Sequence, residues 1–452
     1  MKKIIIIGGG ASGTLLAINL IREAGERAID IAIIERRSRL GRGVAYGTTF
    51  DAHLLNVPAG RMGAFPDDLE HFHRWLNENG HEYQIADFVP RVLFGRYLSD
   101  LLDATLGAAP SGVNVRFIDD DAVDMSKSAA GIAVRIRSGE TIDADDAVLA
   151  FGNFPPPHPN VPDLKFTDSK KYFQDPWGQR LYESVAVDES LFIVGTGLSM
   201  ADVALQMNRI GHSGKIYAIS TRGLLPAVHE LGHSYPSFYD EIKGMRRITD
   251  LLKAVRRHIA AAEAEGGNWR AVIDSLRHET PQIWMDLPVA EKRYFMQHLS
   301  RYWNVARHRM PSAAAAILQN MIAGGKLEIL RGRLKDIAVA GGGSFYVTFA
   351  EYGILRTVST DVLVNCIGAQ SNFAKADSEL VQNILAAGIV RTDKLAMGLD
   401  AAPDGRLIGN DGRIHQNIYT LGPAMKGILW ETTAIPEIRS QARTLALKLL
   451  SD

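Results

Sequence analysis

The chain has 452 residues, a formal net charge of −1 and a single cysteine, Cys366. This length predicts about three domains, and the even mixture of charges excludes the basic footprint of a nucleic-acid or membrane-surface binder. One cysteine excludes a disulfide framework, a cysteine metal cluster and a dithiol relay. Lys2 and Lys3 are followed by only four isoleucines, and no apolar run reaches about 18 residues. We therefore expect no signal peptide and a cytoplasmic protein.

The first 37 residues read as strand, glycine turn, helix and strand. Residues 4–7 are four isoleucines, as in a strand buried on both faces, and residues 31–34 are a second apolar run. Gly8 allows a tight turn, Gly10 lets backbone N–H groups approach a pyrophosphate, and Gly13 lets the helix pack closely on the strand. Glu35 stands roughly 20 residues further on, where an acid can accept hydrogen bonds from ribose hydroxyls. This pattern predicts a dinucleotide site.

The rest of the first 155 residues predicts a mixed α/β arrangement. Residues 36–65 are glycine-rich and are expected to wrap a cofactor as a long loop. The remaining elements are helices at 67–77 and 90–106, a small antiparallel set at 113–118, 132–136 and 141–144, and a buried strand at 147–150. Pro155, Pro156 and Pro157 begin a predicted linker of roughly 30 residues.

The opening pattern then recurs in a variant form. Residues 191–194 predict a strand, Gly195 and Gly197 a glycine turn into a helix, and residues 216–219 the next strand. Met200 occupies the position of the third glycine. The second strand ends at Arg222 without an acid, which favours the 2′-phosphate of NADP over the 2′-hydroxyl of NAD. The alternative is that Arg222 is a solvated loop residue.

Residues 224–312 interrupt this rhythm with predicted helices at 245–262, 269–277 and 290–303. A helix at 312–323 and strands near Leu327, Ile337, Phe345 and Leu355 restore it. Residues 361–367 predict the strand that returns to the first domain, and a strand at 418–422 and a helix at 435–450 complete the chain.

The predicted fold class is α/β, with two Rossmann-like, doubly wound, three-layer nucleotide-binding domains and a helical insertion. We assign residues 1–155 and 366–452 to an FAD-binding domain and residues 186–223 and 313–365 to an NAD(P)H-binding domain. Residues 224–312 form an insertion that covers the cleft between them. Two dinucleotide sites in one chain imply FAD in the first and NADPH in the second, with NADH as the alternative; hydride then passes from nicotinamide to flavin.

Six segments support a resemblance that spans nearly the whole chain. They are GRGVAYGTTFDAHLLNVPAGRM (41–62), PRVLFGRYL (90–98), IVGTGLSMADVA (193–204), STRGLLPAVH (220–229), YWNVARHRMP (302–311) and LGPAMKGILWETTAIPEIRSQA (421–442). With these segments the chain resembles the two-dinucleotide-binding-domain flavoproteins, within the group of FAD-dependent urate hydroxylases and L-aspartate N-hydroxylases. The resemblance implies class B monooxygenase-like chemistry: NADPH reduces FAD, O2 adds at the flavin C4a, and the hydroperoxide transfers one oxygen to a substrate.

Two positions depart from that pattern. The FxGxxxHxxx[WF] signature of flavin-containing monooxygenases is absent, because the linker has Phe151, Gly152 and then three prolines before His158. The late Gly-Asp that usually contacts FAD is Gly422-Pro423 here, so backbone groups and the following helix must replace the carboxylate.

The site residues follow from the motifs and from the resemblance. The candidate catalytic residues are Asn56 near the flavin ring, Arg61 facing substrate or nicotinamide, Arg309 for an anionic group and Trp430 lining the substrate cavity. For Arg61 and Arg309 a structural or solvated role is equally open. The candidate cofactor-binding residues are Gly8, Gly10, Ala11, Ser12, Gly13, Glu35, Arg36, Val44, Asn56, Val57, Met62, Ala122, Val123, Phe151, Gly152, Gly195, Gly197, Leu198, Ser199, Thr221, Arg222, Gly368, Gly422, Trp430, Thr432 and Thr433.

Two segments of the sequence suggest a metal site, but neither is expected to bind a metal. His229-Glu230-Leu231-Gly232-His233 matches HExxH, but Pro226, Gly232 and Pro236 predict a loop where a zinc protease needs a continuous helix. Asp119, Asp120 and Asp121 are interpreted as a turn beside adenine. We expect no bound metal.

The predicted function is an FAD-dependent, NADPH-using monooxygenase that hydroxylates a small polar amine or N-heterocycle through a C4a-hydroperoxyflavin. The alternatives are an NAD(P)H oxidase or flavin reductase without an oxygenated product, and a nucleotide-binding redox sensor. A bare reductase needs no covering insertion, which favours the monooxygenase. Its partners are a small-molecule substrate and O2, with homo-oligomerisation left open.

Overall fold

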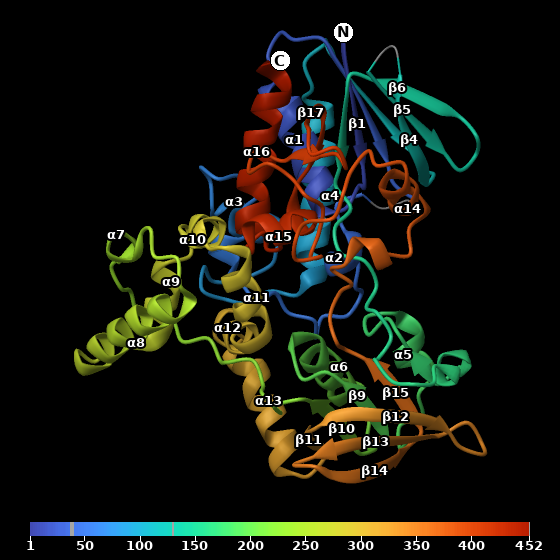
Figure 1. Cartoon of the computed structure of the whole chain (residues 1–452), viewed down its shortest axis with the longest axis vertical. Helices are drawn as coiled ribbons and strands as arrows, with labels where there is room; N and C mark the ends of the chain where they lie inside the picture. The colour runs from blue at the N-terminus through green and yellow to red at the C-terminus, as the bar shows by residue number, and fades with distance from the viewer. Residues whose placement is uncertain (37–39, 129–130, 452) are drawn as a thin grey trace.

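The computed structural model describes residues 1–36, 40–128 and 131–451, so residues 37–39 of the predicted cofactor-wrapping loop lie outside the described residues. Two parallel sheets form two α/β halves, the second below the first in Figure 1, and a group of helices flanks the first half. The two chain termini lie near each other at the far end of the first half (Figure 1). No helix in the described ranges is long and apolar enough to cross a membrane.

The first sheet has six strands in the order β16-β17-β7-β1-β2-β3, and all are parallel except the edge strand β16. Their bounds are Arg406–Ile408 (β16), Ile414–Thr420 (β17), Asp146–Leu149 (β7), Lys2–Ile7 (β1), Ile29–Ile34 (β2) and Val113–Ile118 (β3). The prediction for residues 113–118 was wrong in its partner: β3 pairs in parallel with β2 instead of joining the antiparallel set.

Alternation along β1 divides the first half into three layers. Ile4 and Ile6 pack against one layer of helices, while Ile5 and Ile7 pack against the opposite layer. The first layer contains α1 (Ala11–Glu23), α3 (His71–Glu78), α4 (Arg91–Gly107) and α16 (Ile435–Ser451). The opposite layer contains the antiparallel strands β4 (Ala122–Ser128), β5 (Gly131–Ile136) and β6 (Thr141–Ala144) with α14 (Glu379–Ala386).

The second half repeats this design. Its five parallel strands run in the order β11-β10-β9-β15-β8, with bounds Leu327–Arg331, Ile216–Ser220, Leu191–Val194, Val362–Asn365 and Tyr172–Phe173. One face carries α5 (Gln179–Ser184), α6 (Leu198–Arg209) and α13 (Ser312–Ala323). The other carries the antiparallel strands β12 (Arg333–Val339), β13 (Phe345–Glu351) and β14 (Ile354–Thr360). The predicted fold class, with two Rossmann-like halves, is confirmed.

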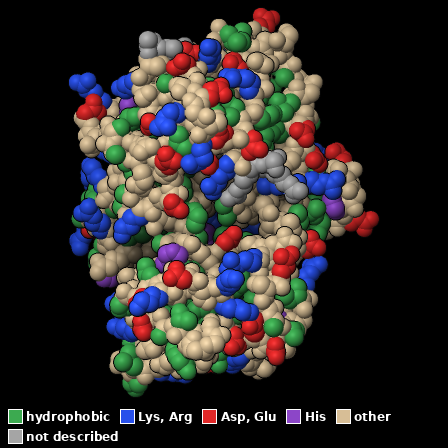
Figure 2. Space-filling model, turned by 90° about the vertical axis from the view of Figure 1, so that its right-hand side faces the viewer, with side chains coloured by type: hydrophobic (Ala, Val, Ile, Leu, Met, Phe, Trp, Pro, Cys, Tyr) green, Lys and Arg blue, Asp and Glu red, His purple; other side chains and the backbone are tan. Residues whose placement is uncertain are grey.

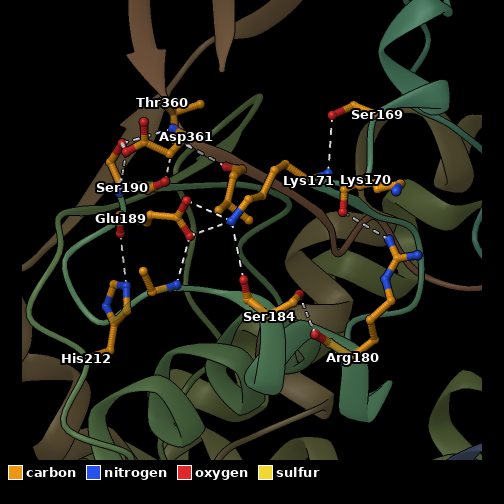
Figure 3. A network of polar contacts seen from close by, with 12 residues as sticks. Ser169, Lys170, Lys171, Arg180, Ser184, Glu189, Ser190, His212, Thr360 and Asp361 are labelled. Atoms are coloured by element: carbon orange, nitrogen blue, oxygen red, sulfur yellow. Dashed lines mark hydrogen bonds and ion pairs between the residues drawn. The ribbon is translucent and has the colours of Figure 1, made fainter. Parts of the chain in front are cut away.

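The segment predicted as a linker after Pro157 is partly structured. It contains η2 (Lys165–Asp168), and its strand β8 is the edge of the second sheet. Figure 3 shows how polar contacts fasten it there: Lys171 Nζ donates to both carboxylate oxygens of Glu189 at 2.7 and 2.8 Å. Asp361, at the start of β15, accepts from the Ser190 backbone N–H at 2.8 Å. The sheet of the second half therefore begins before residue 186.

The insertion is helical, as predicted, but its last helix is divided. Its members are α7 (Tyr239–Ile242), α8 (Ile248–Ala264), α9 (Trp269–Ser275), α10 (Thr280–Asp286), α11 (Val289–His298) and α12 (Ser300–Arg307). The single helix predicted for 290–303 breaks at Leu299, where neither proline nor glycine announces an end. The remaining short elements are α2 (Gly43–Tyr46), α15 (Lys426–Leu429), η1 (Ala59–Arg61), η3 (Phe373–Lys375) and η4 (Gly422–Met425).

Candidate functional site

The first glycine turn has the close contacts that a dinucleotide turn requires. A Cβ on Gly8, whose φ is 107°, would lie 2.4 Å from the carbonyl oxygen of Ala150 at the end of β7. A Cβ on Gly13 would lie 1.9 Å from the carbonyl oxygen of Gly8. Among the described residues, no side chain caps the N-terminus of α1, so its first N–H groups remain available to a phosphate.

A cleft of about 570 Å³ opens beside this turn. Eleven predicted cofactor residues line it: Gly8, Gly10, Ala11, Ser12, Glu35, Arg36, Val44, Ala122, Phe151, Gly152 and Thr433. They come from the first turn, the ends of β2 and β7, the start of β4 and the segment before α16. The first sheet and its helix therefore bring most of the predicted FAD site together.

Arg42 is a lining residue that the sequence interpretation missed. Its buried Nε atom has no hydrogen-bond partner among the described residues. A buried guanidinium donor without an acceptor is costly, and a phosphate oxygen would satisfy it. Arg42 lies in the quoted GRGVAYG segment, so the signal was present but was interpreted only as loop. Together with the glycine cradle, it fits a nucleotide pyrophosphate.

Charged residues lie at one end of the cleft. Arg137 Nε lies 3.3 Å from Asp121 Oδ2, and Arg137 Nη1 lies 3.2 Å from Glu379 Oε2. Arg36 is 4.0 Å from Asp121. Asp120 and Asp121 both line the cleft, as expected for a turn beside a nucleotide. These ion pairs are exposed, so each contributes little to stability and can rearrange around a ligand.

Glu35 directly follows β2, where the sequence predicts a residue that binds the nucleotide ribose. Its Oε2 accepts a hydrogen bond from the Gly9 backbone N–H at 2.8 Å. A carboxylate has about four acceptor positions, so this bond fixes the side chain and leaves capacity for ribose hydroxyls. Glu35 therefore links the shape of the turn to the end of β2.

Gly422 and the threonines after Trp430 form a second tight contact at the start of α1. A Cβ on Gly422 would lie 2.7 Å from Ser12 Oγ. The buried Thr432 hydroxyl donates to the Gly422 carbonyl at 2.9 Å and accepts from Gln441 Nε2 at 2.7 Å. Thr432 is thus committed to holding the loop, whereas Thr433 lines the cleft.

Several other predicted cofactor residues do not line the cleft, among them Gly13, Val57, Met62 and Val123. Val57 and Met62 are buried in the core beneath the helical layer, and Val123 is buried in β4. Gly13 contacts the turn itself. These side chains support the site by packing.

The second glycine turn sits at the ends of β9 and β10. A Cβ on Gly195, whose φ is 119°, would lie 2.3 Å from the carbonyl oxygen of Cys366, after β15. Gly197 precedes α6, and Leu198 and Ser199 form its first, half-buried residues. Thr221 and Arg222 are exposed just after β10, and Gly368, with φ of 96°, follows Cys366. These predicted residues therefore lie together at the C-terminal ends of the strands of the second sheet.

Arg331 is a further cation at these strand ends which the sequence interpretation missed. It ends β11 in direct register with Ser220 of β10, and its guanidinium lies 4.9 Å from the ring centre of Tyr352. Register between two strands far apart in the sequence cannot be read from a local motif.

Trp430 lies at a strained turn between the first half and the insertion. Its φ is 62° and its ψ is −64°, and the Glu431 N–H donates to the Leu429 carbonyl at 2.8 Å. A non-glycine residue in such a γ-turn costs on the order of 1–3 kcal/mol. The indole stacks on Trp284 with ring centres 4.8 Å apart. The surrounding packing therefore holds Trp430 in a conformation that the chain would not adopt alone.

Ion pairs join the insertion to the chain that follows Trp430. Arg307 lies 3.6 Å from Glu431, and Arg277 lies 2.7 Å from Glu437. Trp303 Nε1, on α12, donates to Glu431 Oε1 at 3.1 Å. Burial and the nearby Arg307 lower the pKa of His308 to about 4, so His308 is neutral near pH 7.

The other two candidate arginines are differently placed. Arg309 is only 2% exposed and forms a two-pronged pair with Asp274, at 3.0 and 2.5 Å. While this pair holds, Arg309 is not available to a substrate anion. Arg61 has an exposed side chain, and its carbonyl accepts from Arg439 at 3.0 Å. Asn56 is half-buried, and its carbonyl receives a hydrogen bond from His229 Nε2 at 2.9 Å.

The HExxH segment is a loop, as predicted. Burial lowers the pKa of His229 to about 4, and Glu230 pairs with Arg270 at 2.8 Å. Within the described ranges, no group of three or more His, Cys, Asp or Glu residues is arranged to hold a metal ion.

Comparisons with known proteins agree with this arrangement. Residues 5–154 match a family described as FAD-NAD(P)-binding. A search of curated proteins finds no match. Ornithine N-hydroxylase from Kutzneria sp. 744, in a structure with reduced FAD, NADP+ and L-ornithine, is 16% identical, with 99% of this chain and 98% of that chain covered and a TM-score of 0.62.

Two further solved structures show the range of this fold. Cadaverine monooxygenase from Erwinia amylovora, bound to FAD, is 13% identical over 99% of this chain and 94% of that one, with a TM-score of 0.66. Bacillithiol disulfide reductase from Staphylococcus aureus is 12% identical over 100% and 99%, with a TM-score of 0.59. The chain therefore has a two-nucleotide-domain fold with a first part similar to FAD-NAD(P)-binding domains. The finer resemblance to urate and L-aspartate hydroxylases stays a prediction.

Proposed function

We propose that this protein is an FAD-dependent, NADPH-using monooxygenase that hydroxylates a small amine or N-heterocycle. The observation that carries the proposal is the duplicated strand, glycine turn and helix on two separate parallel sheets, the first beside a cleft with an unsatisfied arginine donor. The flavin N-hydroxylases among the proteins with this fold support the reaction class. We assign FAD to residues 1–155 and 366–452, and NADPH to residues 186–223 and 313–365.

The residues of the chain divide the work of binding. Arg42 and the free N–H groups of α1 hold the pyrophosphate, and Glu35 accepts from the ribose. Thr433 and the first turn of α16 line the same cleft and would stabilise negative charge on a reduced flavin held there. When bound, FAD takes a hydride from NADPH and activates O2.

The insertion, residues 224–312, excludes water from the reaction. The Arg307–Glu431 pair ties its helices to the segment before α16, and the Arg277–Glu437 pair ties them to the first turn of α16. A closed site keeps reactive oxygen species away from solvent until the substrate arrives. We place the protein in the cytoplasm, with a small-molecule substrate and O2 as its partners.

Labelled oxygen tests this function directly. The FAD-loaded protein is mixed with NADPH, 18O2 and a panel of small amines and N-heterocycles, and products are read by mass spectrometry. We expect one atom of 18O in an organic product and a fall in released peroxide. Peroxide release that no compound in the panel lowers would instead support the NAD(P)H oxidase.

A thiol-disulfide reductase is disfavoured, although one such enzyme shares the fold. Cys366 is buried, and burial raises the pKa of its thiol well above the usual range. A thiol held neutral in this way is a poor nucleophile. Replacing Cys366 by alanine should therefore leave NADPH oxidation intact, and loss of activity with retained FAD would favour the reductase.

A further inference from the structure

The helical insertion contains its own cavity, of about 330 Å³. Its walls come from six helices, α7 to α12, together with Trp430, which follows α15. The lining is almost entirely aliphatic and aromatic, with Leu251, Ile273, Phe295 and Trp430 among its members. This cavity is distinct from the nucleotide cleft, since the two share no lining residue.

Polar groups of the lining are turned to other partners. Trp284 Nε1 donates to the Gly427 carbonyl at 3.0 Å, and Trp303 Nε1 donates to Glu431 at 3.1 Å. The Thr280 hydroxyl donates to the Leu276 carbonyl at 2.7 Å. A charged or strongly polar ligand would therefore find few hydrogen bonds inside, whereas an apolar group would lose none.

The size of the cavity also indicates a ligand. An engineered apolar cavity of about 150 Å³ binds benzene, and this one is about twice as large. Its most exposed lining residues are Arg256 and Tyr302, which mark its opening. The opening thus leads from solvent into an apolar interior.

Trp430 connects this cavity to the nucleotide site. Trp430, which has a positive φ, lines the cavity of the insertion, and Thr433, three residues later, lines the nucleotide cleft. The turn at Trp430 directs its indole onto Trp284 of the insertion. Only Glu431 and Thr432 therefore stand along the chain between a wall residue of the apolar cavity and a wall residue of the nucleotide cleft.

We propose that this cavity binds the apolar body of the substrate, an uncharged aromatic or aliphatic group of a small amine, and that Trp430 is its wall toward the flavin. The inference rests on the proposed function and narrows its substrate class. A small, wholly polar amine leaves the chamber empty, whereas an amine with a hydrocarbon group fills it. Burial of that group supplies the binding free energy, at a cost in affinity for short substrates.

Calorimetry and kinetics with matched tryptophan variants test the inference. Leu252→Trp fills the cavity from α8, and Ala260→Trp adds the same side chain to an exposed position of the same helix that does not line the cavity. Indole is titrated into the full-length, FAD-loaded proteins, and n-hexylamine is compared with n-propylamine as a stimulant of NADPH oxidation. FAD absorbance reports that each variant has folded.

We expect indole to bind wild type and Ala260→Trp at one site and to bind Leu252→Trp at least about tenfold more weakly, a difference of about 1.4 kcal/mol. The KM for n-hexylamine should rise in Leu252→Trp alone, and n-propylamine should stimulate poorly in every protein. Absence of saturable indole binding to wild type, or equal binding by both variants, would overturn the inference. A protein that binds no FAD or does not oxidise NADPH contradicts the proposed function instead, and the indole titration decides the cavity separately.

Discussion

The two glycine turns of this chain share the way in which the chain enters the helix, but they differ in how closely the helix packs on the turn. In each, the first glycine has positive φ and lies against a carbonyl at the end of the neighbouring strand: Gly8 against Ala150, and Gly195 against Cys366. Both helices begin directly after a glycine N-cap in an extended conformation, Gly10 and Gly197. The entry of the chain into the helix is therefore the shared element.

The two turns differ at the third glycine position of the motif. A Cβ on Gly13 would overlap the Gly8 carbonyl, at 1.9 Å, while Met200 stands at the equivalent position with its side chain fully buried in the core. Helix α6 must therefore stand further from its turn than α1 does. The lesson is that the first two glycines define the turn, whereas the third defines how closely the helix packs.

Replacing Gly13 by alanine should give the largest effect. The added methyl group meets backbone on one side, which cannot move without displacing α1, so we expect a loss of more than about 3 kcal/mol and no bound FAD. Met200→Leu conserves volume and should cost less than about 1.5 kcal/mol. Chemical denaturation and FAD absorbance measure both. An FAD-loaded Gly13→Ala protein as stable as wild type would remove the distinction between the turns.

This contrast shows what the sequence could predict. Local spacing predicted both turns and the position of Glu35, because these features depend on neighbouring residues; the other predicted residues that line the cleft were named from the resemblance. The positions of Arg331 and β8 are set by pairing between strands that are distant in sequence. The break at Leu299 accompanies a tertiary contact, the hydrogen bond from Trp303 to Glu431. Arg309 was assigned by residue type, but its partner Asp274 lies on α9. Such pairings are set by tertiary packing, which periodicity does not report.

His53 offers a way to test the contact between the two halves. It is fully buried, Nδ1 lies 2.8 Å from Thr48 Oγ1, and the nearby Arg91–Asp202 pair, at 2.9 Å, joins α4 to α6. Burial lowers the pKa of His53 to about 4. The unfolded chain therefore binds more protons between pH 6.5 and 4, so stability falls as the pH is lowered through that window.

The neutral state of His53 should contribute about 2 kcal/mol to the loss of stability between pH 7.5 and 5. His53→Asn keeps a polar partner for Thr48 and does not titrate, so its unfolding temperature should depend less steeply on pH. His229 and His308 have the same sign and remain in both proteins. A variant that is uniformly less stable but has the wild-type slope would show that the pKa of His53 is the same in the folded and the unfolded chain.

Glu35 is the acidic residue of the first nucleotide motif, and the second motif has no acid at the equivalent place. Loss of its bond to Gly9 and of its contacts to ribose should weaken FAD binding by about 2 kcal/mol in Glu35→Ala, roughly 30-fold in Kd. Glu35→Gln can still accept from Gly9 and should lose less. Fluorescence titration of the stripped protein with FAD gives both values. Equal affinity in all three proteins would mean that the carboxylate does not contact the nucleotide.

The smallest expected effect concerns the second turn, where Arg222 and Arg331 replace the acid. Their strands are neighbours in register, so both guanidinium groups can reach one 2′-phosphate. Arg222→Ala should raise the KM for NADPH about tenfold, or about 1.4 kcal/mol, and leave the KM for NADH unchanged. Arg331→Ala should act in the same direction but less, because its guanidinium also contacts Tyr352. A parallel rise for both coenzymes would place these arginines on the shared part of the nucleotide, and the preference for NADPH would then have to come from another edge of the second sheet.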